Sequence, residues 1–325
     1  MKKRVVVLST GGTIASSPGE DGRNVSGALP GEALVQQLAL GDGYDIHVES
    51  VLQKPSNALN FDDWLTLHAR IQQLQQSAQV EGIVVTHGTD TLEDTAYFLQ
   101  STLYADACPI VVTGSQRVPH EQGSDAYTNL AQAIVVAASE AARGAGVLVV
   151  FNESIFSANN VRKANSFQVN GFEAPGFGHL GYVDQGSATL LQKPVLPTPL
   201  ALGAALPRVD IVPVALGMGP ELFQASAHSG AQGIVIDGIG RGHVPPTWMP
   251  AIRDAIQAGV TVAITSSCLQ GPLHQAYEFT GSLHELESAG VLRASNLSAR
   301  KARVRLAVAL SQPSTDALQN LFPYY

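Results

Sequence analysis

The stretch 83–94 constrains the fold more than any other part of the chain, because its pattern changes twice within twelve residues. It reads Ile-Val-Val-Thr-His-Gly-Thr-Asp-Thr-Leu-Glu-Asp. The three β-branched residues at its start predict a buried parallel strand. Apolar residues recur at helical spacing from Leu92 onward, and Glu93 and Asp94 stand where acids favour a helix N-terminus. The stretch therefore predicts a strand, a tight turn and a helix, the unit from which α/β sheets are built.

The turn inside this stretch gathers polar side chains at the carboxyl end of the predicted strand. In open α/β sheets, ligands bind at that end of the strands. Helix capping by a threonine or an aspartate would explain one of these residues but not the cluster. We therefore expect the turn to form part of a ligand site. Its polar members are Thr86, His87, Thr89, Asp90 and Thr91.

Predicted strands and helices alternate through the first half of the chain. Four βα units in a row predict a larger N-terminal domain built on a doubly wound, mostly parallel sheet. Residues 187–207 are rich in Pro, Gly and Ala and predict a linker, after which the alternation restarts. We expect an N-terminal catalytic α/β domain at 1–186 and a smaller C-terminal α/β domain at 208–325. The strands expected in the first domain are 4–8, 45–51, 83–85, 109–113 and 146–151.

Composition excludes several functional classes. The 325 residues are long enough for two domains, and 45% apolar against 14% charged residues indicates a globular chain. The formal net charge is −8, and no run of Lys or Arg offsets it. We therefore expect no nucleic-acid partner and no binding to an anionic membrane.

The N-terminus and the cysteines indicate a cytoplasmic protein. Met-Lys-Lys-Arg is followed by an apolar run that is too short for a signal peptide, and no stretch reaches transmembrane length. Cys108 and Cys268 are the only cysteines, which is too few for a disulfide framework or a zinc site. We expect reduced thiols and neither a metal nor a cofactor.

A glycine-rich turn follows the first predicted strand. The segment 9–15 reads Ser-Thr-Gly-Gly-Thr-Ile-Ala and lacks both GxGxxG and the Gly-Lys-Ser/Thr of a P-loop, so it is a weak signal for nucleotide binding. Its two glycines let the backbone approach a ligand closely, and Thr13 follows them. The polar segment 16–30 predicts a mobile loop, and a lid and an inert surface loop fit it equally well.

Four strand-end loops carry groups that could act together: Thr13, Ser56, Thr89-Asp90 and Lys163. A threonine hydroxyl becomes a good nucleophile only when a base takes its proton. A lysine whose pKa is tuned by its surroundings can be that base, and an aspartate can orient it. Main-chain N–H groups of glycine turns can hold an oxyanion. This combination predicts acyl transfer without a metal or cofactor, whereas Lys163 alone would be an ordinary surface charge.

Two segments carry a family resemblance. Thr10-Gly-Gly-Thr-Ile-Ala15 and Thr86–Asp94, in this order and spacing, resemble the signature segments of the bacterial-type L-asparaginases, the asparaginase/glutaminase family. The resemblance covers essentially the whole chain. It also includes Ser56-Asn57, Lys163 and Lys301-Ala-Arg303.

The resemblance implies hydrolysis of L-asparagine to L-aspartate and ammonia, sometimes with glutamine as a second substrate. By similarity, Thr13 is the nucleophile that forms an acyl-enzyme. Thr89, Asp90 and Lys163 resemble a second triad that activates the attacking hydroxyl or water.

The resemblance also implies how the substrate is bound. Ser56 and the Gly88 turn would hold the α-carboxylate, and Asp90 would meet the α-amino group. Asn57 and Ser115 are further candidates for substrate binding, because both lie in polar loops at strand ends.

Family members are usually homotetramers built from close dimers, in which a neighbour's C-terminal domain completes each site. His243 and Glu278 match the neighbour's positions, with Glu278 as a second anchor for the substrate ammonium. Ordinary surface polarity explains His243 equally well.

One departure from the family pattern stands in the segment 16–30. The family's flexible loop usually carries a tyrosine beside the nucleophile, whereas this segment contains none and has Asn24 or Val25 near that place. The sequence leaves three explanations: another group replaces the phenol, activation of Thr13 differs, or the rate is low.

Other functions fit parts of the pattern. An amidase acting on glutamine, a small lactam or an amidated peptide would share the triad and differ in pocket length, which Ser56 and Asn57 help to set. A non-catalytic amino-acid or nucleotide binder would explain the glycine turns. It would not explain why Lys163 occurs together with Thr89 and Asp90.

Overall fold

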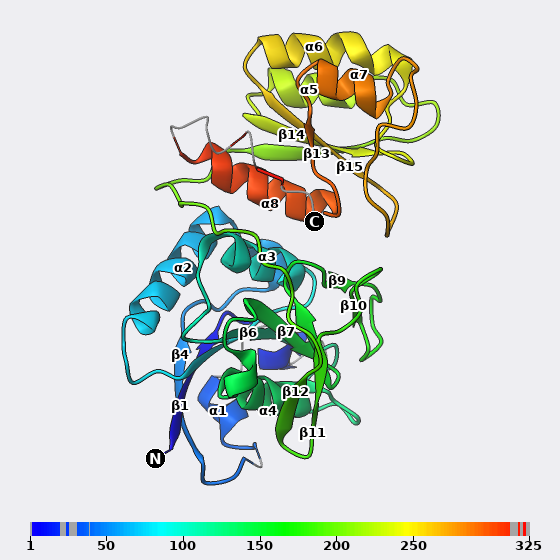
Figure 1. Cartoon of the computed structure of the whole chain (residues 1–325). Helices are drawn as coiled ribbons and strands as arrows, with labels where there is room; N and C mark the ends of the chain where they lie inside the picture. Colours follow the sequence, from blue (N-terminus) through cyan, green and yellow to red (C-terminus); the bar gives the residue numbers. More distant parts are fainter. Residues whose placement is uncertain are drawn as a thin grey trace. The chain divides into compact units, whose positions relative to one another are not determined.

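An eight-stranded sheet forms the centre of the first of two units in the computed structural model, Met1–Leu196 (Figure 1). A second unit, Pro197–Tyr325, has a sheet of its own. The fold class expected from the sequence is confirmed in both units. The structure describes residues 2–19, 24–25, 31–38, 40–312, 318 and 321–322.

Five strands of the large sheet run parallel, in the order β4-β1-β5-β6-β7. The chain winds outward from β1 in both directions, which creates a switch point between β1 and β5. In that register Ser9 lies beside Thr86, so the turns that follow the two strands leave the sheet side by side. The five strands are β1 Lys3–Ser9, β4 Tyr44–Ser50, β5 Gly82–Thr86, β6 Ile110–Thr113 and β7 Val147–Phe151.

Helices cover both faces of this sheet, as a doubly wound fold requires. Leu34 and the apolar face of α4 pack with Val5, Val7 and Val84 in one buried cluster. On the other face, α3 lies against β6 and β7 and is buried along its whole length. The helices are α1 Gly31–Val35, α2 Phe61–Gln75, α3 Leu92–Thr102 and α4 Ala126–Ala137.

A break separates α4 from the 3-10 turn that follows it. α4 stops at Ala137, and Ser139 adopts an extended conformation that ends helical propagation. The hydroxyl of Ser139 accepts a hydrogen bond from the N–H of Ala141 and begins a separate 3-10 turn, η3, Glu140–Ala142.

Three antiparallel strands extend the sheet beyond β7: β8 Ser154–Ser157, β11 Gly181–Asp184 and β12 Ser187–Leu190. The expected linker 187–207 therefore begins inside the sheet. Residues 187–190 have an extended, half-buried pattern and pair with β11, and the two units divide between Leu196 and Pro197.

The second unit holds four parallel strands in the order β13-β14-β15-β16. One face packs a core that contains Phe223, Trp248 and Leu283. Helix α8 lies against β13, β14 and β15. The strands are β13 Val209–Pro213, β14 Gly233–Gly238, β15 Thr261–Ser266 and β16 Leu292–Arg293, and the helices are α5 Glu221–His228, α6 Met249–Gln257, α7 Leu283–Ser288 and α8 Ala299–Leu310.

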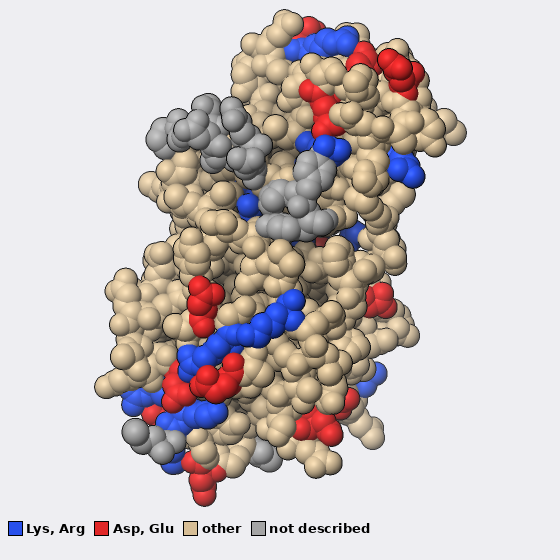
Figure 2. Space-filling model, in the orientation of Figure 1, with Lys and Arg blue, Asp and Glu red and all other residues tan. Residues whose placement is uncertain are grey.

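Charged side chains are sparse and mixed in sign on the face shown in Figure 2. Both cysteines are free: Cys108 is buried, which raises the pKa of its thiol to about 11, and Cys268 is exposed. None of the helices in the described part of the chain is long and apolar enough to span a bilayer.

Candidate active site

Two glycines bring the turns after β1 and β5 into contact. The N–H of Thr10 donates to the carbonyl of Thr86 at 3.1 Å, which ties the turns together. A Cβ added to Gly12 would lie 2.4 Å from the Cα and N of Gly88, and Gly12 has a φ of 84°. Only glycine fits both restraints. Thr13 starts the 3-10 turn η1, Thr13–Ala15, directly after this contact.

The loop after β4 contacts the same Gly88 turn. A Cβ on Gly88 would lie 2.8 Å from the Cβ and Oγ of Ser56, so Ser56 stands against the Gly88 turn. The hydroxyl of Thr91 donates to the carbonyl of Ser56 at 2.8 Å and fixes that loop. The same loop also bonds the turn after β1, because the main-chain N–H of Lys54 donates to the carbonyl of Thr10 at 3.1 Å.

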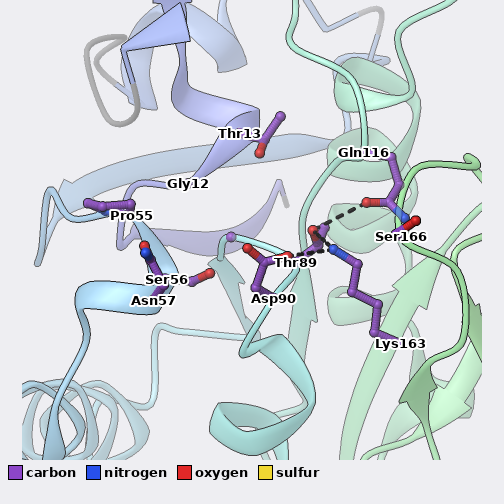
Figure 3. A pocket seen from close by; sticks show the side chains of 11 residues that line it. Gly12, Thr13, Pro55, Ser56, Asn57, Thr89, Asp90, Gln116, Lys163 and Ser166 are labelled. Carbon is purple, nitrogen blue, oxygen red and sulfur yellow. Dashed lines mark hydrogen bonds and ion pairs between the residues drawn. The ribbon is translucent and has the colours of Figure 1, made fainter.

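Lys163 reaches this group from β9, Arg162–Lys163, which pairs with β10, Phe172–Glu173. Its Nζ donates to Thr89 Oγ1 at 2.8 Å and to Asp90 Oδ1 at 2.6 Å (Figure 3). The side chain of Lys163 is 14% exposed and that of Asp90 is 69% exposed. The lysine is therefore a largely buried member of the site and not a solvated surface charge.

Thr89 does not cap the following helix. Helix α3 begins at Leu92 with Thr91 as its N-cap residue, and no side-chain cap hydrogen bond forms there. The Thr89 hydroxyl donates instead to Gln116 Oε1 at 3.2 Å. Thr89, Asp90 and Lys163 thus form one hydrogen-bonded group.

A cavity of about 260 Å³ opens over these groups. Thr13 stands on one side of it, and the group of Thr89, Asp90 and Lys163 lies across from it (Figure 3). The structure thus brings together most of the site residues expected from the sequence. The lining consists of Gly12, Thr13, Pro55, Ser56, Asn57, Gly88, Thr89, Asp90, Gln116, Lys163 and Ser166.

Ser115 lies differently from the prediction. It is fully buried, its hydroxyl donates to the carbonyl of Arg117 at 2.7 Å, and it is not among the lining residues. The next residue, Gln116, faces the cavity in its place. Successive residues after a strand point to different sides, so a polar loop by itself does not show which of them reaches the ligand.

His87 supports the turn from beneath. It is fully buried, and burial lowers the pKa of its imidazole to about 4. Its Nε2 lies 2.8 Å from Thr95 Oγ1, which also accepts a hydrogen bond from Trp64 Nε1 at 2.9 Å. The carbonyl of Gly88 can only accept, so Nδ1 donates to it at 2.7 Å, and Nε2 of the neutral ring accepts from the Thr95 hydroxyl. The imidazole is held neutral in one tautomer.

His243 and Glu278 belong to the second unit, and their suggested role at a neighbour's site stays a prediction. His243 Nδ1 accepts a hydrogen bond from the N–H of Leu283 at 3.3 Å, and burial lowers its pKa. Its ring meets Phe279 and Tyr277 edge-on, with ring centroids at 5.0 and 5.8 Å. Glu278 is exposed.

The tyrosine-free segment 16–30 is described only in part. Ser17–Pro18 (β2) pairs with Asn24–Val25 (β3), and Val25 is 51% exposed. Residues 20–23 and 26–30 lie outside the described residues. Neither Asn24 nor Val25 is among the residues that line the cavity.

The functional groups that line the cavity suit transfer of an acyl group to a hydroxyl. It offers two threonine hydroxyls, one lysine–aspartate pair and the main chain of two glycine turns. Among the residues that the structure describes, no three His, Cys, Asp or Glu side chains gather as metal ligands would.

Comparison with known families decides the relationship. The family model "Asparaginase, N-terminal" matches residues 4–196, and "Glutaminase/Asparaginase C-terminal domain" matches residues 208–322. The chain belongs to the asparaginase family. The resemblance predicted from the two signature segments is thereby confirmed.

The relatives of this asparaginase-family chain include L-asparaginases and a glutaminase-asparaginase. The L-asparaginase of Bacillus licheniformis is 42% identical over 311 residues, which cover 96% of each chain. The L-asparaginase 2 of Escherichia coli (strain K12) is 32% identical over 99% of this chain and 93% of its own. The glutaminase-asparaginase of Pseudomonas fluorescens biotype A is 32% identical over 99% and 90%.

A solved structure shares the whole fold. The crystal structure of the probable cytoplasmic L-asparaginase from Campylobacter jejuni superposes with a TM-score of 0.88 at 30% sequence identity, covering 100% of both chains. Both units of this asparaginase-family chain therefore have the fold of that structure.

Proposed function

We propose that this protein hydrolyses L-asparagine to L-aspartate and ammonia. The observation that carries the proposal is the cavity in which Thr13 faces Thr89, itself bonded to Lys163 at 2.8 Å. The names of the relatives from Bacillus licheniformis and Escherichia coli support the same substrate.

Substrate binding would use the Ser56 side of the cavity. Ser56 and the Gly88 main chain offer hydrogen bonds to an α-carboxylate, and the exposed carboxylate of Asp90 suits an α-ammonium group. A short amino acid anchored there places its side-chain amide between Thr13 and Thr89. Holding the reacting atoms in this way is a large part of the catalytic effect.

The first chemical step would form an ester on Thr13. Thr13 Oγ1 attacks the amide carbon, the C–N bond breaks, and the hydroxyl proton passes to the departing nitrogen, which leaves as ammonia. Main-chain N–H groups of the glycine turns would stabilise the negative charge on the carbonyl oxygen.

The second step would hydrolyse this ester. Lys163, acting through the Thr89 hydroxyl, takes a proton from a water molecule, and the resulting hydroxide attacks the ester carbon. The C–O bond to Thr13 breaks, L-aspartate leaves, and the proton returns to Thr13. Asp90, at 2.6 Å from Lys163 Nζ, balances the charge that the lysine gains with this proton.

Glutamine is a second candidate substrate, because a relative at 32% identity is named a glutaminase-asparaginase. We also propose that the protein is a homotetramer, assembled as a dimer of close dimers. A cytoplasmic location belongs to the same proposal. The half-exposed rings of Tyr277 and Phe279 beside His243 support a contact with another copy. The name of the Campylobacter jejuni protein supports the location.

The test is ammonia release by the purified protein from L-asparagine, with L-glutamine, D-asparagine and no substrate alongside. Saturable release from L-asparagine, lost in Thr13→Ala, is the expected result. Mass spectrometry of Thr89→Val after incubation with L-asparagine should then show an aspartyl ester on Thr13. No release from L-asparagine under any condition would overturn the proposal, and native mass measurement tests the oligomer separately.

A further inference from the structure

The Thr89 hydroxyl has a single proton, and the structure shows where it points. Thr89 Oγ1 accepts a hydrogen bond from Lys163 Nζ at 2.8 Å and donates its own proton to Gln116 Oε1 at 3.2 Å. Gln116 is thus the second partner, beside Lys163, of the hydroxyl on which the proposed function depends.

The amide of Gln116 is oriented by a second contact. Its Nε2 donates to the carbonyl of Asn165 at 3.1 Å. A carbonyl oxygen can only accept, so the NH₂ group must face Asn165 and Oε1 must face Thr89. Turning the amide over would lose both hydrogen bonds.

The main chain of Gln116 is fixed as well. One carboxylate, Asp125, accepts from the N–H groups of Gln116 and Arg117, each at 3.0 Å. Asn129 Nδ2 holds that carboxylate at 3.0 Å and donates to the carbonyl of Gly114 at the same distance. The loop after β6 therefore presents this one side chain from a rigid base.

Gly171 supplies the space that the amide fills. A Cβ added there would lie 2.0 Å from Gln116 Nε2 and 3.0 Å from the carbonyl oxygen of Gln168, so the amide is the closest obstacle. Its φ is not among the positive values of the described glycines, so conformation does not require glycine at this position. A glycine that is needed only for space indicates a site shaped around the Gln116 amide.

We propose that Gln116 is a positioning residue that holds the Thr89 hydroxyl between Lys163 and the cavity, and that Gly171 makes this position available. This inference rests on the proposed function and names a residue that acts through Thr89. Because Gln116 Oε1 accepts the Thr89 proton, the lone pairs of Thr89 Oγ1 face Lys163 and the cavity. Without Oε1 the hydroxyl can adopt other rotamers, and fewer molecules have those lone pairs aligned for proton transfer from water. The anchors for the α-carboxylate and α-ammonium are untouched, and the affected step follows ester formation, so kcat and KM fall together and kcat/KM is unchanged.

The first variants are Gln116→Met, which removes the acceptor at similar volume, and Gly171→Ala, which pushes the amide aside without changing the cavity chemistry. Each should lower kcat for L-asparagine about tenfold, the order expected for one lost hydrogen bond, with kcat/KM within about twofold. Gln132→Met is the matched control, because Gln132 Oε1 also accepts one 3.2 Å hydrogen bond, from the main-chain N–H of Glu153, and Gln132 is not among the cavity-lining residues.

The double variant separates positioning from general damage. If Gly171 acts through Gln116, Gly171→Ala lowers kcat in the native background and has no further effect in Gln116→Met. Equal effects in both backgrounds, or full kcat in Gln116→Met, would overturn the inference.

A crystal structure of Gly171→Ala gives a readout that does not depend on turnover. Displacement of the amide together with a changed or split Thr89 rotamer supports the inference. An unchanged, single Thr89 rotamer beside a displaced Gln116 refutes it, whether or not the protein releases ammonia. Failure of the proposed function would show separately, as an inactive wild-type protein.

Discussion

The main-chain N–H of Lys163 donates a 2.6 Å hydrogen bond to Oε2 of Glu93. Glu93 is only 2% exposed and lies in the first turn of α3, where the helix dipole stabilises a carboxylate. This bond joins the helix that follows Thr89-Asp90 to the strand that carries the lysine. The separation between Lys163 and its two partners is therefore set by the backbone as well as by the side chain.

Glu93→Ala should lower both activity and stability. Loss of a hydrogen bond to a charged group costs about 1.5–3 kcal/mol of unfolding free energy, and a shift of the β9 backbone should lower kcat at least about tenfold. Glu93→Gln keeps an oxygen that can accept from Lys163 and should retain most of the activity. Urea unfolding and ammonia release measure the two effects, and a fully active alanine variant would show that the bond does not position the lysine.

Gly12→Ala should destabilise the chain and abolish activity. The added Cβ would lie 2.4 Å from the Gly88 main chain, and the φ of 84° is strained for alanine. Together these costs should reach about 3 kcal/mol or more, as measured by urea unfolding. The turns carrying Thr13 and Thr89 must separate to relieve the clash, so ammonia release should be lost.

The matched control is Gly186→Ala. Gly186 also has a positive φ, 71°, but a Cβ there would meet nothing within 4 Å. Only conformational strain remains, about 1–2 kcal/mol, and activity should be unchanged. Equal stability losses at Gly12 and Gly186 would show that the close approach to Gly88 matters little.

Thr89→Val should abolish turnover while the protein stays folded. Valine has nearly the shape of threonine but cannot relay a proton between Lys163 and the cavity. Loss of the hydroxyl also leaves Gln116 Oε1 and Lys163 Nζ with one partner fewer, which should cost about 1–3 kcal/mol. Circular dichroism checks the fold and ammonia release checks activity. A Thr89→Val protein with wild-type kcat would remove Thr89 from the mechanism.

The parallel half of the first sheet could be predicted from sequence because buried strands are apolar on both faces and helices follow them directly. The antiparallel half could not. The β7–β8 and β11–β12 hairpins turn on Asn152-Glu153 and Gln185-Gly186, all with positive φ. These pairs lack the Asn-Gly or Asp-Gly signal of such turns, and the neighbouring strands are only four or five residues long.

The residues of the candidate site also fall into those that the sequence could predict and those that it could not. Thr13, Thr89 and Asp90 follow parallel strands whose order can be expected, so their meeting at one edge of the sheet could be predicted. Lys163 follows the antiparallel strand β8 and lies in β9, so its place beside them could not be derived from the order of the parallel strands. Gln116 could not be chosen over Ser115, because the choice depends on how Asp125 clamps the loop after β6. Long-range contacts of this kind leave no periodic pattern in the sequence.

Acidification should destabilise the protein through His87. Burial lowers the pKa of this imidazole from 6.5 to about 4 in the folded chain. Above pH 6.5 the side chain is neutral in both the folded and unfolded states, so it adds no pH dependence. Between pH 6.5 and 4 the unfolded chain binds a proton that the folded chain does not, and the unfolding free energy therefore falls as the pH falls. Below pH 4 both states are protonated and this contribution levels off.

The expected size is about 2 kcal/mol between pH 7 and 5, since each unit of pKa difference is worth about 1.4 kcal/mol per proton. Urea unfolding of wild type and His87→Gln at both pH values measures it. The variant is less stable at pH 7, because the hydrogen bonds to Thr95 and Gly88 are rearranged. Its unfolding free energy should nevertheless change by about 2 kcal/mol less between the two pH values. His68, whose pKa burial also lowers, is present in both proteins and cancels from the difference. Parallel pH dependences in the two proteins would show that His87 is solvated enough to titrate in the fold.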